Sequence, residues 1–148
     1  MIAVFERFHR ELAKIPDPAA ARLCENWKAA RVNYSNPPPG VKRSQLALGL
    51  EQGLREIPLL LGPFATQHRT VAARAYHAAL EAEYPAFLQT ERERLAKVLS
   101  RGRISGESEF ILVRHVIDIG EEGGTDFSTL AQLYRLVDSF EAKGRRGA

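Results

Sequence analysis

The sequence predicts an all-α protein, an irregular helical bundle of about six or seven amphipathic helices. Apolar residues recur at intervals of three and four along most of the chain, which is the period of a helix with one buried face. The segments between these runs are rich in proline, glycine, serine and threonine, residues that begin and end helices. The sequence shows no internal repeat of fixed period, so a helical solenoid is disfavoured.

The first two helices are expected to form an antiparallel hairpin with a very short connection. Pro16 stops the first helix, Asp17 can cap the second, and Pro18 suits a first helical position because its missing N–H is not needed there. The predicted buried face of the first helix is Phe5, Phe8, Leu12 and Ile15. The predicted buried face of the second is Ala20, Leu23, Trp27, Ala30 and Tyr34, with Trp27 as its anchor.

The third helix follows a proline-rich break at residues 36–40 and can be capped by Ser44. Gly49 and Gly53 lie one turn apart in it, and we attribute them to the close approach of a neighbouring backbone. The predicted buried residues are Leu46, Leu50, Leu54, Ile57 and Leu61. Because Leu46, Leu48 and Leu50 also alternate as in a strand, a strand remains the alternative for this segment.

The fourth helix is alanine-rich, begins near Thr66 and ends near Tyr84, before Pro85. Its predicted buried side is Val71, Ala75, Ala79 and Ala82, with Tyr76 and Leu80 beside them. The next helix is either separate or continues across a kink at the proline, and its predicted buried residues are Leu88, Leu95, Val98 and Leu99.

Two further helices are expected before the C-terminus. Ser105 can cap the first, which carries acidic residues in its first turn and ends at Gly120. Thr125 or Asp126 can cap the second. The predicted core residues of the pair are Phe110, Leu112, Val113, Val116 and Ile117, then Phe127, Leu130, Leu133, Tyr134, Val137 and Phe140.

Length and composition predict one helical domain over residues 1–142, followed by a disordered basic tail at 143–148. A division into 1–57 and 63–142, at a break that contains proline and glycine, is the alternative. Cys24 is the single cysteine, which favours a reducing compartment. Charge at the sixth residue excludes a secretory signal, and no apolar stretch approaches the ~20 residues of a membrane helix. We therefore expect a cytoplasmic protein with no membrane partner.

The net charge of +3 conceals an uneven distribution of sign along the chain. Residues 1–105 hold sixteen Lys and Arg against ten Asp and Glu, a balance of +6. Residues 106–142 hold two Arg against eight acids, a balance of −6. Internal complementarity between helical layers explains this pattern, and so does a partner of complementary charge or self-association.

Two constellations of the sequence are compatible with catalysis or metal binding. Glu6 and His9 have the i,i+3 spacing of a metal-binding helical pair, but only one copy exists, so a solvated charged face is favoured. His115 and Asp118 have the spacing of an oriented general base, without an accompanying nucleophile, so a surface cluster with Arg114 is favoured. The sequence therefore predicts no metal, no cofactor and no enzymatic activity.

Basic residues gather on and just after one helix, where a phosphate or a protein partner could bind: Arg92, Arg94, Lys97, Arg101 and Arg103. Arg114 and His115 extend the candidate surface, and Tyr34 beside the prolines is a candidate for presentation to a partner groove. No exposed aromatic residues are expected around the basic group, which disfavours nucleic acid. Our main hypothesis is a non-catalytic helical module that binds another protein or itself. The alternative is a nucleic-acid-binding regulator that uses the basic group.

Overall fold

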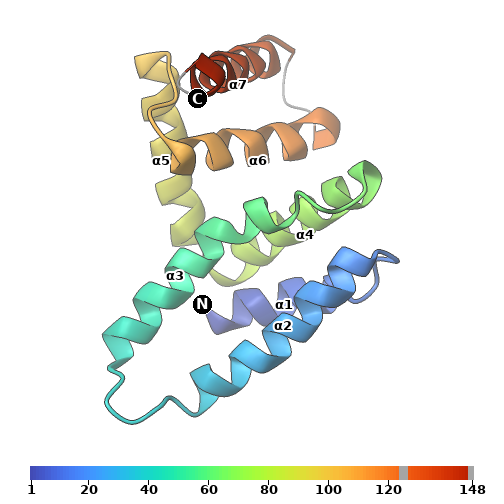
Figure 1. Ribbon diagram of the computed structural model, residues 1–148, viewed down its shortest axis with the longest axis vertical. Helices are drawn as coiled ribbons and strands as arrows, with labels where there is room; N and C mark the ends of the chain where they lie inside the picture. Colours follow the sequence, from blue (N-terminus) through green and yellow to red (C-terminus); the bar gives the residue numbers. More distant parts are fainter. Residues whose placement is uncertain (124–126, 147–148) are drawn as a thin grey trace. The chain divides into compact units, whose positions relative to one another are not determined.

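The computed structural model describes residues 1–123 and 127–146, and within them the chain forms seven helices and no strand (Figure 1). The predicted all-α fold is confirmed. The helices are α1 (Ile2–Leu12), α2 (Pro18–Ser35), α3 (Arg43–Leu60), α4 (Thr66–Glu83), α5 (Pro85–Arg101), α6 (Glu107–Gly123) and α7 (Phe127–Arg146). None of the described helices is long and apolar enough to cross a membrane.

The chain divides into two compact units, Met1–Pro85 and Ala86–Ala148. The division falls at the start of α5, where Pro85 separates that helix from α4. It does not coincide with the proline- and glycine-containing segment at 58–62. Pro58 lies inside α3, and the Tyr76 hydroxyl of α4 donates to the Leu54 carbonyl of α3, which ties together the helices on either side of that segment.

In the first unit, α1 packs against both α4 and α2. The aromatic core of this unit is one continuous cluster. The Trp27 ring stacks on Phe5, with centroids 4.9 Å apart, and on His9, at 5.3 Å. Phe8 meets Tyr76 edge-on at 5.6 Å, which links α1 to α4. Trp27 is therefore the anchor that the sequence predicts.

The short connection between α1 and α2 also joins α4. Asp17 caps α2 as predicted, because its Oδ1 accepts the Ala19 N–H at 2.9 Å, and Pro18 takes the first helical position. Its Oδ2 accepts the N–H of Ala65, the residue before α4, at 3.1 Å, and faces Nδ1 of His68 at 2.9 Å. One carboxylate thus binds the N-terminal ends of two helices.

Two details of α3 differ from the sequence-based expectation. Lys42, not Ser44, precedes the helix, and its N–H donates to the Gln45 side chain at 2.9 Å. A Cβ on Gly53 would lie 3.4 Å from the Phe5 ring, and one on Gly49 would lie 3.7 Å from the Tyr34 hydroxyl oxygen. Aromatic side chains, rather than a backbone, approach both glycines.

The predicted buried face of α4 is wrong at two positions. Val71 and Ala82 are exposed, whereas Ala72 and Ala73 are buried with Tyr76, Ala79 and Leu80. Alanines surround this helix on every side, so the apolar period does not distinguish one face from the other. The contact with α1 selects the face.

In the second unit, α6 packs against α7, and the core gathers side chains from all three helices and the α5–α6 turn. The buried members are Val98, Ile104, Val113, Ile117, Leu133, Leu136 and Val137. Phe110 lies at the edge of this core, half-buried and stacked on Phe140 at 5.1 Å. Tyr134 is exposed rather than inward-facing, because the adjacent Leu133 and the later Leu136 fill the core.

The ends of α6 and α7 lie beyond their predicted positions. Gly120 is buried within α6, which continues to Gly123. The caps expected at Thr125 or Asp126, and the side chain of Phe127, lie outside what the structure describes. The helix α7 runs to Arg146, whereas a disordered tail was expected from residue 143.

Replacement of Trp27 by alanine tests the first core. We expect Trp27→Ala to reduce the free energy of unfolding by on the order of 3 to 5 kcal/mol, because the ring is buried and stacks on both Phe5 and His9. Val32→Ala on the exposed side of the same helix is the control, with a change within about 0.5 kcal/mol. Urea denaturation of both variants measures the difference. Equal losses would show that the α2 face is assigned wrongly.

Candidate functional site

The basic residues of α5 lie on two sides of the helix. Arg94, Lys97 and Arg101 are spaced three and four residues apart and therefore share one face. Arg92 precedes Arg94 by two residues, a rotation of about 200°, and points the other way. The structure thus brings together only part of the predicted basic group on α5.

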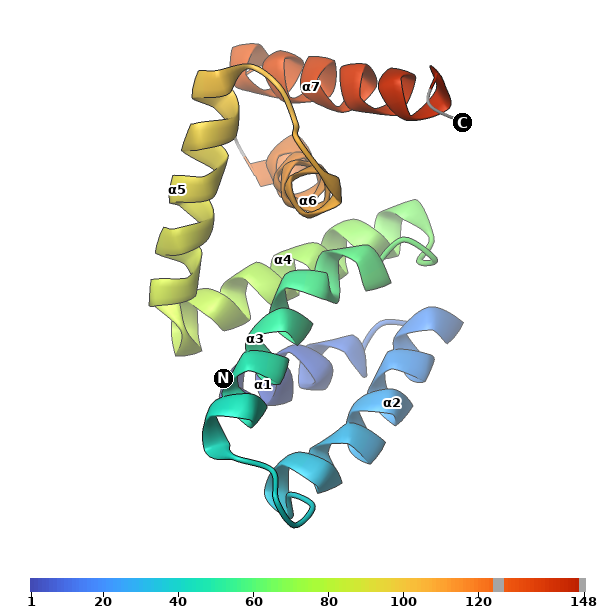
Figure 2. The same cartoon turned by 60° about the vertical axis from the view of Figure 1, so that its left-hand side comes forward.

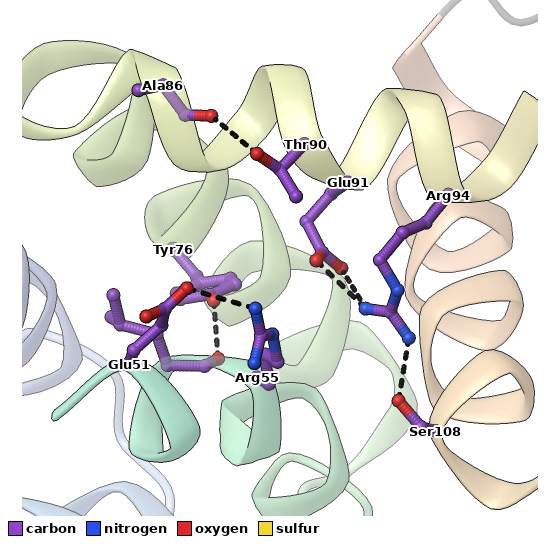
Figure 3. A network of polar contacts seen from close by, with 9 residues as sticks. Glu51, Arg55, Tyr76, Ala86, Thr90, Glu91, Arg94 and Ser108 are labelled. Carbon is purple, nitrogen blue, oxygen red and sulfur yellow. Dashed lines mark hydrogen bonds and ion pairs between the residues drawn. The ribbon is translucent and has the colours of Figure 1, made fainter. Parts of the chain in front are cut away.

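Arg94 is occupied by contacts within the second unit (Figure 3). Its Nη1 donates to both carboxylate oxygens of Glu91, at 2.9 and 3.0 Å, and its Nη2 donates to the Ser108 hydroxyl at 2.6 Å. The first contact lies within α5 and the second reaches the first turn of α6. Arg94 therefore fixes the angle between two helices rather than presenting a free guanidinium.

Arg101 has a similar structural role at the α5–α6 turn. Its guanidinium donates to the Arg103 carbonyl and forms an ion pair with Glu109. Glu109 also accepts the N–H and O–H of Ser105, at 2.8 and 2.9 Å. The predicted Ser105 cap is consequently wrong: the serine donates, and the carboxylate reaches back as in a capping box. Partial burial acts to raise the pKa of Glu109, but the Ser105 hydrogen bonds and the Arg101 charge lower it overall.

The remaining predicted site residues differ in their exposure. The side chains of Arg92, Lys97 and Arg103 are exposed, and Arg114 is half-buried. His115 was expected on the polar side of α6, but it is only 8% exposed. It follows Leu112 at a spacing of three, so it shares a second, buried face of this helix.

The Glu6 and His9 pair is not arranged as a metal site. Glu6 pairs with Arg31, while the His9 ring packs between aromatic rings and its Nδ1 lies 2.7 Å from the Phe5 carbonyl. His9 is half-buried rather than solvated as expected, and desolvation lowers its pKa. Among the described residues, no three His, Cys, Asp or Glu side chains group closely enough to hold a metal ion.

Tyr34 is not presented by the proline-rich loop. Its ring is half-buried and stacks on Trp27, with centroids 6.4 Å apart. The exposed side chains around that loop include apolar and basic ones. Val32 is 61% exposed and Leu48 is 68% exposed. Val41, which lies between them in the sequence, is also exposed. This surface was missed by the sequence analysis, although the proline run and the adjacent Lys42 and Arg43 were visible there.

A second group of exposed apolar residues flanks the turn between α3 and α4. Leu59 and Leu60 end α3, and Val71 lies in the second turn of α4. Each is about half exposed, at 55%, 47% and 54%. The spacing of apolar residues predicts that Val71 is buried, so the exposure of Leu59, Leu60 and Val71 could not be recognised from the sequence.

Comparison of the chain with protein-family models, curated proteins and solved structures finds no match.

Removal of the Arg101 side chain tests its structural role. We expect Arg101→Ala to lower the free energy of unfolding by on the order of 1 to 2 kcal/mol, because Glu109 loses its cationic partner and the Arg103 carbonyl loses a donor. Arg103→Ala keeps that carbonyl and changes an exposed side chain, so its effect should stay within about 0.5 kcal/mol. Thermal and urea unfolding measure both variants. A larger loss of stability in Arg103→Ala than in Arg101→Ala would contradict a structural role for Arg101.

Glu109 gives this structural role a pH dependence. Its folded pKa lies below the ordinary value of 4.5, so the unfolded chain takes up a proton first as the pH falls. The stabilisation is complete above about pH 4.5 and is lost as the pH falls through the folded pKa. Glu109→Gln should flatten the stability profile below pH 4.5.

His9 gives the first unit a pH dependence in a higher range. Desolvation is the largest cause of its lowered pKa, so the unfolded chain binds a proton more readily than the folded chain. Stability should be complete above pH 6.5 and decline as the pH is lowered through that value. An NMR titration of the imidazole measures the folded pKa. A value above 6.5, or an unchanged stability profile in His9→Phe, would contradict the burial argument.

Proposed function

We propose that this chain is a non-catalytic helical module that acts by stoichiometric association with another protein. The observation that carries the proposal is that six of the eight large exposed apolar side chains in the described part of the chain lie in, or within two helical turns of, the two turns that bound α3. One group is Val32, Val41 and Leu48, and the other is Leu59, Leu60 and Val71. Scattered apolar residues are normal on a protein surface, but grouped ones mark interaction sites.

The internal contacts of the basic residues also favour this proposal over the alternative. A nucleic-acid-binding regulator would need its arginines free to contact phosphates. Arg94 and Arg101, central to the predicted group, are held by Glu91, Ser108 and Glu109. Arg92 and Lys97 remain exposed, but they lie on different sides of α5.

The experiment that tests the proposal is recovery of the full-length chain from its native cells with its bound partner. Native mass spectrometry should show a complex of fixed stoichiometry, and sedimentation of the purified chain alone distinguishes a foreign partner from self-association. A chain that is monomeric alone and recovered without a stoichiometric partner would exclude the proposed function.

Binding to a generic DNA duplex separates the two hypotheses. We expect no binding tighter than the roughly 10⁻⁴ M range near physiological salt, as for a mildly basic surface. Arg92→Ala with Lys97→Ala is the appropriate variant, because both side chains are exposed and their loss leaves the α5–α6 contacts intact. Arg10→Ala with Arg22→Ala in the first unit is the control. Tight binding that only the first variant loses, with a shallower salt slope, would favour the nucleic-acid hypothesis.

A further inference from the structure

The turn between α2 and α3 is exposed along its whole length. We name residues 35–45 the α2–α3 tip, and each of them is exposed, including Pro37, Pro38 and Pro39. Figures 1 and 2 both show the connection at the end of α2 and α3 that lies away from α1 and α4. The α3–α4 turn, by contrast, buries Leu61 and Phe64. The prolines of the tip therefore contribute nothing to the core of the first unit.

The chain fixes the conformation of the tip before any partner binds. Each proline holds φ near −65°, and each residue before a proline is restricted to extended or polyproline II geometry. Three such residues make one turn of a polyproline II helix. The Val41 N–H then donates to the Pro38 carbonyl at 3.3 Å, and Gly40 adopts a φ of +88°, as a turn with Pro-Gly at its centre requires. Such preorganisation lowers the entropy cost of binding.

The charge around the tip has one sign. Lys42 and Arg43 follow the prolines, and the sequence contains no Asp or Glu between Glu25 and Glu51. In the described part of the chain, neither of these two cations forms a salt bridge. The tip therefore combines a rigid proline turn, an exposed Val41 and two neighbouring positive charges.

We propose that the α2–α3 tip docks as a polyproline II ligand into an aromatic-lined groove, with an acidic rim, on a partner protein. The inference rests on the proposed function and assigns it a surface and a partner chemistry. Aromatic rings of such a groove pack against the proline ridges, and its donors bind the proline carbonyls. Carboxylates on its rim pair with Lys42 and Arg43 and orient the ligand.

Two other classes of macromolecule fit the tip less well. Single-stranded nucleic acid needs exposed aromatic rings for base stacking, and Tyr34, the nearest, is stacked on Trp27. An anionic membrane gains only about 1 kcal/mol for each cation near its surface, and the tip offers two cations and no exposed aromatic anchor.

The test is an NMR titration of the isotopically labelled full-length chain with purified SH3, WW and EVH1 domains. At least one should perturb amides confined to the tip and its flanks, with a dissociation constant below about 1 mM. Combined Pro37→Ala, Pro38→Ala and Pro39→Ala should abolish the perturbation. Lys42→Glu with Arg43→Glu should weaken binding by about tenfold or more.

Matched controls use exposed residues of the same types in the same unit. Pro63→Ala, in the α3–α4 turn, should leave binding unchanged, as should Arg10→Glu with Arg22→Glu. The inference is overturned if no domain perturbs the tip, or if binding survives the triple proline substitution. Tip-dependent binding to phosphatidylcholine–phosphatidylglycerol vesicles or to a DNA duplex overturns it as well, and assigns the tip to that ligand.

Failure of this inference is distinguishable from failure of the proposed function. If the partner recovered from native cells binds the triple proline variant as tightly as the unaltered chain, the tip is not its docking site and the proposed function stands. If that partner loses at least about tenfold in affinity for the variant, and none for Pro63→Ala, the inference is supported.

Discussion

The packing of the first unit depends on the carboxylate of Asp17. It lies between two prolines, and its two oxygens accept hydrogen bonds at the beginning of α2 and of α4. The positive ends of both helix dipoles favour a negative charge at this point. The hydrogen bond with His68 is the largest cause of its lowered pKa, followed by the bond from the Ala19 N–H. Once α2 and α4 share this anchor, α1 can pack against both of them.

The exposure of the α2–α3 tip follows from where this anchoring ends. The aromatic contacts of α1 and α2 reach α3 at Gly53, beside the Phe5 ring, and at Gly49, beside the Tyr34 hydroxyl. Residues 43–45, at the beginning of α3, are exposed. The core therefore holds the base of the α2–α3 pair and leaves its proline turn outside. A rigid turn on a fixed base suits recognition better than packing.

Local signals in the sequence were enough to predict the helices, because the Pro-Asp-Pro connection and the three-four period act over a few residues. Burial was predictable only where a helix has a single apolar face, as with Phe5 and Phe8 of α1. The helices α4 and α6 have apolar residues on more than one side, so Val71 and His115 were misplaced. Which side of such a helix is buried depends on the helices packed against it, and the apolar period does not encode those neighbours. For the same reason the exposed apolar groups beside α3 could not be foreseen.

Contacts within the second unit account for part of the uneven charge distribution along the sequence. Arg101, from the basic part of the chain, pairs with Glu109 from the acidic part, and Arg94 reaches Ser108 just before it. Complementarity within the second unit therefore accounts for part of the asymmetry, and a partner of opposite charge is not needed to explain it. At the tip, Lys42 and Arg43 lie in a segment of the sequence that contains no acid to pair with them. Among the described residues, no salt bridge involves Lys42 or Arg43, so complementarity within the first unit does not account for the positive charge of the tip.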